Sequence, residues 1–115
     1  MKKLVLAISW ILAAAALLAA DITGTWTAAV VLDVGSGTAT FKFEQKGEAL
    51  TGTYTGTLGE AKLSGTVKGD TVEWSFTNDQ AGKVSYKGKL EGTSKMKGTT
   101  EYGQLGAGTF TAEKQ

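Results

Sequence analysis

The side chains that could do acid–base chemistry in this chain are carboxylates and lysines. The 115 residues include no histidine, cysteine or arginine, which excludes histidine-based triads, thiol nucleophiles and metal sites built from nitrogen or sulfur ligands. The alternation of the sequence directs Glu44, Glu73 and Glu101 to solvent, and turn formation explains the acidic residues in the turns. We therefore expect a protein that is not an enzyme and that holds no metal or cofactor.

Aromatic residues are the better candidates for a binding site. Nine of them follow residue 20, all on the apolar positions of an alternating pattern: Trp26, Phe41, Phe43, Tyr54, Trp74, Phe76, Tyr86, Tyr102 and Phe110. One shared interior explains this placement. The candidate ligand-binding residues are Trp26, Tyr54, Trp74 and Tyr86, with an aromatic-lined end near the last three. The expected ligand is a small apolar or aromatic molecule.

Five lysines form a second candidate site, on the outer face of two neighbouring predicted strands: Lys83, Lys87, Lys89, Lys95 and Lys97. A functional interpretation is contact with an anionic glycan, lipid headgroups of the cell envelope or an acidic partner. The alternative is that these lysines keep a sheet in solution and discourage pairing at its edges. Both interpretations stay open.

The candidate residues must be positioned by strands. The alternation of polar and apolar residues that indicates a strand is clearest in residues 50–58. Threonine occupies every odd position from 51 to 57, while the even positions read Leu, Gly, Tyr, Gly, Leu. This period of two predicts a strand with a polar face and a packed face. Related units of the form apolar-x-Gly-x-apolar recur at residues 22–26, 63–67, 86–90 and, more weakly, 96–100.

The whole chain beyond residue 20 follows this alternation. The predicted strands span residues 22–32, 38–45, 50–58, 62–68, 71–77, 83–90, 93–102 and 107–114, with residues 33–37 as the first turn. The turns are short, so neighbouring strands must pair antiparallel in chain order. Inward glycines at 24, 52, 56, 65, 88 and 98 favour closure, because glycine lets strands bend at corners and leaves room for neighbouring rings. The predicted fold is all-β, a single eight-stranded antiparallel up-and-down (meander) β-barrel.

The first twenty residues form a separate segment. Met1-Lys2-Lys3 is basic, residues 4–18 are apolar, and Ala19-Ala20 precede the change in polarity at Asp21. This order predicts a signal peptide over 1–20 and a barrel domain over 21–115, exported to the periplasm or secreted; a retained anchor is the alternative. Once the signal is cleaved, no spanning membrane segment is expected.

The charge of the exported part limits its partners. Removing residues 1–20 leaves ten lysines and eleven acidic residues, a net charge of −1, so nucleic acid is not an expected partner. The sequence leaves the oligomeric state open. It also leaves open whether the barrel is hollow and binds a ligand or has a solid core and acts as a structural or interaction protein of the envelope.

Several short segments resemble the avidin and streptavidin family of eight-stranded barrels, in the same strand order. They are residues 22–26 (ITGTW), 49–54 (ALTGTY), 72–74 (VEW), 86–88 (YKG) and 108–111 (GTFT). Gly24-Thr25-Trp26 is also similar to the Gly-x-Trp signature of the wider calycin group, which includes lipocalins. The chain also looks like small exported bacterial proteins of no assigned function.

The resemblance implies a barrel that binds a ligand at one end. It implies that Tyr54 corresponds to the tyrosine that donates to the biotin ureido oxygen, and that Trp74 and Tyr86 correspond to pocket walls. Three polar positions of the family are Ala28, Gly56 and Gly108 here. Each hydrogen-bond partner that the buried ureido group loses would cost about 1 to 3 kcal/mol, so tight biotin binding is not expected.

Overall fold

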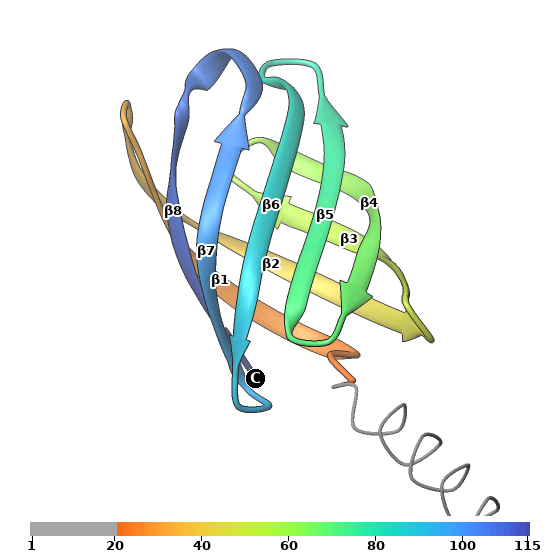
Figure 1. Ribbon diagram of the computed structural model, residues 1–115. Helices are drawn as coiled ribbons and strands as arrows, with labels where there is room; N and C mark the ends of the chain where they lie inside the picture. The colour runs from red at the N-terminus through yellow and green to blue at the C-terminus, as the bar shows by residue number, and fades with distance from the viewer. Residues whose placement is uncertain (1–20) are drawn as a thin grey trace, which may run out of the picture.

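The computed structural model describes residues 21–115, so the predicted signal peptide at 1–20 lies outside the described residues. The strands are β1 (Gly24–Leu32), β2 (Gly35–Lys46), β3 (Ala49–Gly56), β4 (Gly59–Lys68), β5 (Thr71–Asn78), β6 (Gly82–Glu91), β7 (Lys95–Tyr102) and β8 (Ala107–Lys114), with a short 3₁₀ turn, η1 (Gly103–Leu105), before the last strand. All pair antiparallel in chain order, and β8 pairs with β1 to close the barrel (Figure 1). This confirms the predicted eight-stranded meander barrel. No helix within residues 21–115 is long and apolar enough to span a membrane.

The alternation of each strand decides which side chains face inward. In β5, Val72, Trp74 and Phe76 are buried while Glu73 between them is exposed. The same two-residue period runs through the other strands, because successive side chains leave a strand on opposite faces. All nine aromatic residues of the described chain are buried, with at most 6% of any of them exposed. The shared interior predicted from the sequence is therefore confirmed.

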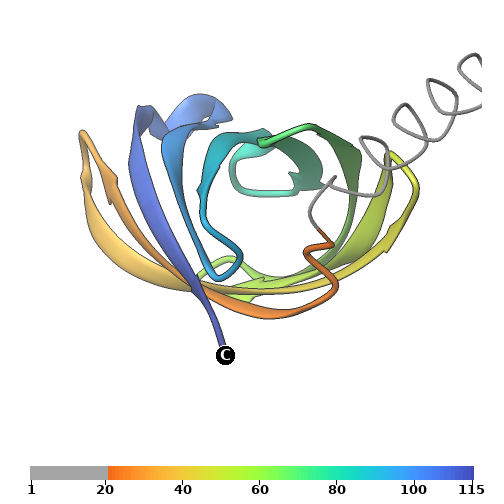
Figure 2. The same cartoon turned by 60° about the horizontal axis from the view of Figure 1, so that its bottom comes forward.

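The first hairpin differs from its predicted form. The turn contains only Asp33 and Val34, and Leu32 pairs directly with Gly35, so β2 begins three residues earlier than predicted. Glycine and serine at 35–37 indicate a loop by propensity, but pairing with the β-branched end of β1 outweighs that preference. The partner strand β3 joins β2 only from Ala39 onward. The hairpin tip therefore extends beyond β3 at one end of the barrel (Figure 2).

Glycine enables closure in two ways. A Cβ atom at Gly98 would lie far closer than 3.0 Å to the carbonyl oxygen of Lys87 on the adjacent strand, and the same holds for Gly52, Gly65 and Gly108 against their own neighbours. At Gly88 a Cβ would instead meet side chains, 2.8 Å from Cζ of Phe110 and 2.9 Å from Sδ of Met96. The first group permits close backbone approach, and Gly88 leaves room for a ring.

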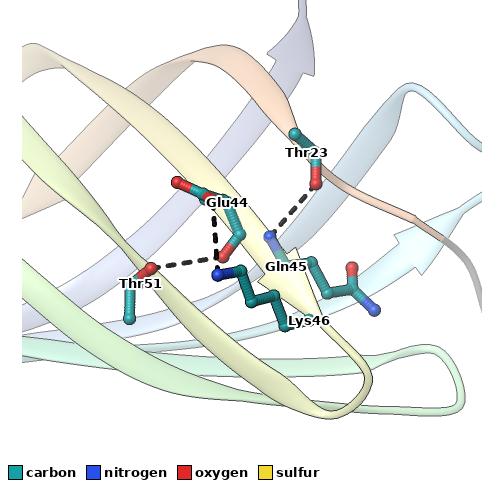
Figure 3. A network of polar contacts seen from close by, with 5 residues as sticks. All are labelled: Thr23, Glu44, Gln45, Lys46 and Thr51. Atoms are coloured by element: carbon teal, nitrogen blue, oxygen red, sulfur yellow. Dashed lines mark hydrogen bonds and ion pairs between the residues drawn. The ribbon is translucent and has the colours of Figure 1, made fainter.

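The chain before β1 closes one end of the barrel. Ile22 and Trp26 are fully buried, and Trp26 Nε1 donates a hydrogen bond to the Ile22 carbonyl at 2.9 Å. Ile22 N donates to Oε1 of Gln45 at 2.9 Å, and Gln45 N donates to Oγ1 of Thr23 at 3.1 Å. Figure 3 shows the contact between Thr23 and Gln45, and beside it the contacts of Glu44 with Thr51 and Lys46. The side-chain oxygen of Gln45 thus holds Ile22, and its backbone N–H holds the Thr23 side chain, in place of strand pairing, so β1 begins at Gly24 and not at residue 22.

Candidate functional site

The middle of the barrel is filled by aromatic rings. Trp74 and Tyr86 stack with 5.0 Å between ring centroids and 6° between ring planes. Phe41 and Phe110 pack edge-on against this pair, with centroids 4.9 to 5.6 Å away. Each of the four residues is 2% exposed or less. Such offset and edge-to-face contacts stabilise a solid core beyond the burial of area alone.

A cavity of about 210 Å³ lies at the end of the barrel opposite Ile22, between the β1–β2 turn, the β3–β4 turn and η1. Its apolar lining is Val30, Leu32, Val34, Leu58 and Leu105; small residues complete the wall at 35–38 and Thr57. The alternation of β1 turns Val30 and Leu32 inward, and Leu58 and Leu105 pack against the core from the turns. Tyr54 and Tyr102, 2% and 6% exposed, are the polar residues buried in this cavity.

The four predicted ligand-binding residues lie at three different depths. Tyr54 lines the cavity at the open end. Trp74 and Tyr86 lie one layer deeper in the filled core, because Tyr86 pairs with Thr100 while Tyr102 lies two residues nearer the open end. Trp26 lies at the opposite, closed end beside Ile22. The structure therefore places Tyr54 in a cavity lined by Tyr102, Leu58 and Leu105, and not by Trp74 and Tyr86.

The additional cavity residues are Tyr102, Leu58 and Leu105. The position of Tyr102 at the end of a strand, on the inward face, is the signal that could have indicated it. Leu58 stands on the packed face of the predicted strand 50–58 and does lie inward, although β3 ends at Gly56. Leu105 lies outside the strands, where periodicity carries no information. Its inward placement follows from how η1 folds over the end of the barrel.

Three tyrosine hydroxyl groups lie at and below the floor of the cavity. The hydroxyl of Tyr54 accepts a hydrogen bond from the backbone N–H of Leu58 at 3.4 Å. The hydroxyl of Tyr102, which also lines the cavity, is hydrogen-bonded to the hydroxyl of Tyr86 one layer deeper. Each of the three hydroxyls thus has a hydrogen-bond partner, as burial of a hydroxyl requires. Among the described residues, the buried Nε1 of Trp74 has none.

The same burial raises the pKa of two of these phenols, Tyr86 and Tyr102. Burial raises the pKa of Tyr102 to about 12, and the neighbouring Tyr54 adds to the rise, while the hydrogen bond with Tyr86 opposes it. Burial also raises the pKa of Tyr86 far above its ordinary value, with the nearby Tyr102 as the next cause. Both hydroxyls are therefore neutral hydrogen-bonding groups at neutral pH.

The five lysines of the second candidate site lie on the outer faces of β6 and β7, as their alternation predicts. Four of them lie beside a carboxylate: Lys87–Glu73 at 3.9 Å, Lys89–Asp70 at 3.9 Å, Lys95–Glu113 at 3.8 Å and Lys97–Glu91 at 3.3 Å. Each of these side chains is more than half exposed, so the pairs contribute only about 0 to 1 kcal/mol each. The neighbouring acids nevertheless reduce the positive field that the lysines alone would create.

A wider groove of about 660 Å³ crosses the outer wall from β4 to β8. It follows a row of short side chains, Ser64, Ser75 and Ser85, which lie opposite one another on adjacent strands. Its charged residues include Glu73 with its partner Lys87. Residues 21–115 contain no group of three or more histidine, cysteine or acidic side chains that could hold a metal ion.

The comparisons with known proteins define the class of the fold. No protein-family model and no curated protein matches the sequence. Among solved structures, the chain is similar to a redesigned β-barrel, mFAP1, in a structure bound to DFHBI, with a TM-score of 0.60 and 17% sequence identity. The match covers 87% of this chain and 97% of that one. At this identity the likeness concerns the fold alone, an eight-stranded β-barrel, here with an aromatic interior.

Proposed function

We propose that this protein is an exported binding module that holds a small apolar or aromatic molecule in the cavity at its open end. The observation that carries the proposal is the uncharged, mainly apolar cavity of about 210 Å³ around Tyr54 and Tyr102. Binding sites for small molecules are commonly concave and apolar with a few polar groups that orient the ligand, and the mouths of β-barrels are a preferred place for them. The proposal of export rests on the basic, then apolar, order of residues 1–20.

Two comparisons support a binding role for this fold. The barrel mFAP1 binds DFHBI, so an eight-stranded barrel of similar shape can hold a ligand. The resemblance to avidin also implies a site at one end of the barrel that includes Tyr54. The inward positions Ala28, Gly56 and Gly108 offer no polar side chain, so the proposed ligand is not a tightly bound biotin.

Filling the cavity tests the proposal. Leu32→Trp places an indole in the space between Val30 and Leu105, and we expect it to weaken binding of toluene by at least about tenfold, because an overpacked site excludes the ligand. Val31→Trp is the matched control, because Val31 directly precedes Leu32 in β1 but faces outward and is 56% exposed. Calorimetric titration of both variants and the parent with toluene measures the effect.

Equal loss of toluene binding in both variants, or no binding by the parent, would contradict a site at the open end. If the site binds toluene as expected, native mass spectrometry of protein purified from its own source identifies the resident molecule. Repeated absence of a co-purifying small molecule would favour a solid-core protein.

A second candidate function is a structural or interaction protein of the envelope that acts through its outer surface. The observation that favours it is the filled middle of the barrel, where Trp74, Tyr86, Phe41 and Phe110 leave the interior solid. The proposed contact is the lysine face of β6 and β7 with an anionic glycan or the envelope surface. Such a contact would weaken with salt, because exposed charges are screened over about 8 Å at physiological ionic strength.

For this second candidate, we expect a variant with four lysines replaced by glutamine to lose binding to anionic vesicles at low salt. The positions are Lys87, Lys89, Lys95 and Lys97. Each exposed substitution should change the free energy of unfolding by about 0.5 kcal/mol or less, so lost binding reports a lost contact. Cosedimentation with vesicles and glycans at low and moderate salt measures it. Equal binding by parent and variant, or none by either, would eliminate the lysine face as a functional site.

A further inference from the structure

Two residues that line the open-end cavity belong to no strand. Leu58 lies in the β3–β4 turn and Leu105 in η1. Among residues 21–115, no backbone–backbone hydrogen bond outside the strands involves Leu58. Side chains hold its backbone instead: its N–H donates to the hydroxyl of Tyr54 at 3.4 Å, and its carbonyl oxygen accepts from Nδ2 of Asn78 at 3.0 Å. The position of this part of the cavity wall therefore depends on two side chains.

Asn78 holds a second segment with the other half of its amide. It is the last residue of β5 and continues the inward positions of Trp74 and Phe76, but it does not line the cavity. Its Oδ1 atom accepts hydrogen bonds from the backbone N–H groups of Gln80 at 2.8 Å and Ala81 at 3.2 Å, which folds the residues after β5 into an Asx turn. The nitrogen of the amide thus holds the β3–β4 turn, and its oxygen folds the β5–β6 loop.

The β5–β6 loop in turn holds η1. Ala81 is fully buried, and its carbonyl oxygen accepts a hydrogen bond from the N–H of Gln104 at 3.0 Å, next to Leu105. Gly103 begins η1 with a φ of +50°, and a Cβ atom there would lie far closer than 3.0 Å to the same Ala81 oxygen. The approach of η1 to the loop therefore requires a residue without a side chain.

We propose that Asn78 is the positioning residue of the open-end cavity, which holds Leu58 and Leu105 at the separation that a small ligand needs. The contacts run from Leu58 through the Asn78 amide and the Ala81 backbone to Gln104, beside Leu105. This role rests on the proposed function of the cavity. Walls that move independently would bind a small molecule less well, because a gap of about 0.5 to 1 Å already forfeits about a quarter to a half of the dispersion attraction.

Two substitutions separate the two halves of the amide. Asn78→Asp keeps an oxygen that accepts from Gln80 and Ala81 but removes the donor to Leu58, because an ionised carboxylate only accepts. Asn78→Ala removes both halves. Asp79→Ala is the matched control, since Asp79 is the next residue, is exposed, and its side chain takes no part in these contacts.

We expect amide hydrogen exchange, measured without ligand, to show which contact each variant loses. In Asn78→Asp the N–H of Leu58 should exchange at least about fivefold faster than in the parent, while that of Gln104 keeps the parent rate. In Asn78→Ala both should exchange faster. Toluene should bind both variants at least about fivefold more weakly than the parent, and it should bind Asp79→Ala as tightly as the parent.

NMR measures the exchange, calorimetric titration gives the affinities, and thermal unfolding confirms that each variant is folded. Parent exchange rates for both amides in Asn78→Ala, or equal acceleration of both in Asn78→Asp, would overturn the role of Asn78, while toluene binding by the parent would leave the proposed function standing. Unchanged toluene affinity in both variants would also overturn this role. If the parent binds no toluene, the proposed function fails, and the exchange pattern still decides whether Asn78 holds the two walls.

Discussion

Replacing Gly98 by alanine is expected to destabilise the barrel by about 3 kcal/mol or more, the largest effect we predict for a single added methyl group. The Cβ atom would overlap the carbonyl oxygen of Lys87 and lie within 3.0 Å of Cα of Gly88 on the adjacent strand. Backbone atoms in a closed sheet cannot move apart without breaking the hydrogen bonds between β6 and β7. Urea unfolding followed by tryptophan fluorescence measures the change.

Gly37→Ala is the matched control for this prediction. Gly37 also lies in a strand, but its nearest neighbour is Oγ1 of Thr57 at 3.7 Å, an ordinary contact. We expect its free energy of unfolding to stay within about 0.5 kcal/mol of the parent. Similar unfolding midpoints for Gly98→Ala and the parent would show that close backbone approach at β6–β7 is not needed for closure.

Replacing Trp26 by alanine is expected to cost about 3 to 5 kcal/mol, the usual range for a buried tryptophan. Trp26 is fully buried and donates its indole N–H to the carbonyl of Ile22 at 2.9 Å. The variant loses apolar burial and also leaves the Ile22 carbonyl without this donor. Since small domains have about 5 to 15 kcal/mol of stability in total, the closed end of the barrel should become the least stable part of the molecule.

Two further variants separate the contributions at this end. Trp26→Phe keeps much of the ring and removes the hydrogen bond, so we expect a cost of about 1 to 3 kcal/mol. Val31→Ala changes the same strand on its exposed face and should cost about 0.5 kcal/mol or less. Chemical denaturation of all three variants provides the comparison. A loss below 1 kcal/mol in Trp26→Ala would contradict a tightly packed closed end.

The strand number, the antiparallel order and the inward face of each strand could be predicted from the sequence. These properties are local, because the side-chain period of a strand is two and short turns force neighbours to pair. The alternation within residues 50–58 already places Tyr54 inward, and the same rule places every buried aromatic residue. The sequence also predicted that glycine permits bending and close packing, because inward glycines recur in strands that must be neighbours.

The tertiary structure alone decided which inward residues meet. Closure of β8 on β1 sets the stagger between strands, and that stagger places Tyr54 with Tyr102 at one end, Trp74 with Tyr86 in the middle and Trp26 at the other end. No local pattern records the distance of a residue along the barrel axis, because it depends on the register of all eight pairings together. The acidic partners of Lys89 and Lys97 and the inward position of Leu105 depend on the same register. The sequence therefore determined the wall of the barrel and which side chains face its interior, while closure determined whether they fill it and where space for a ligand remains.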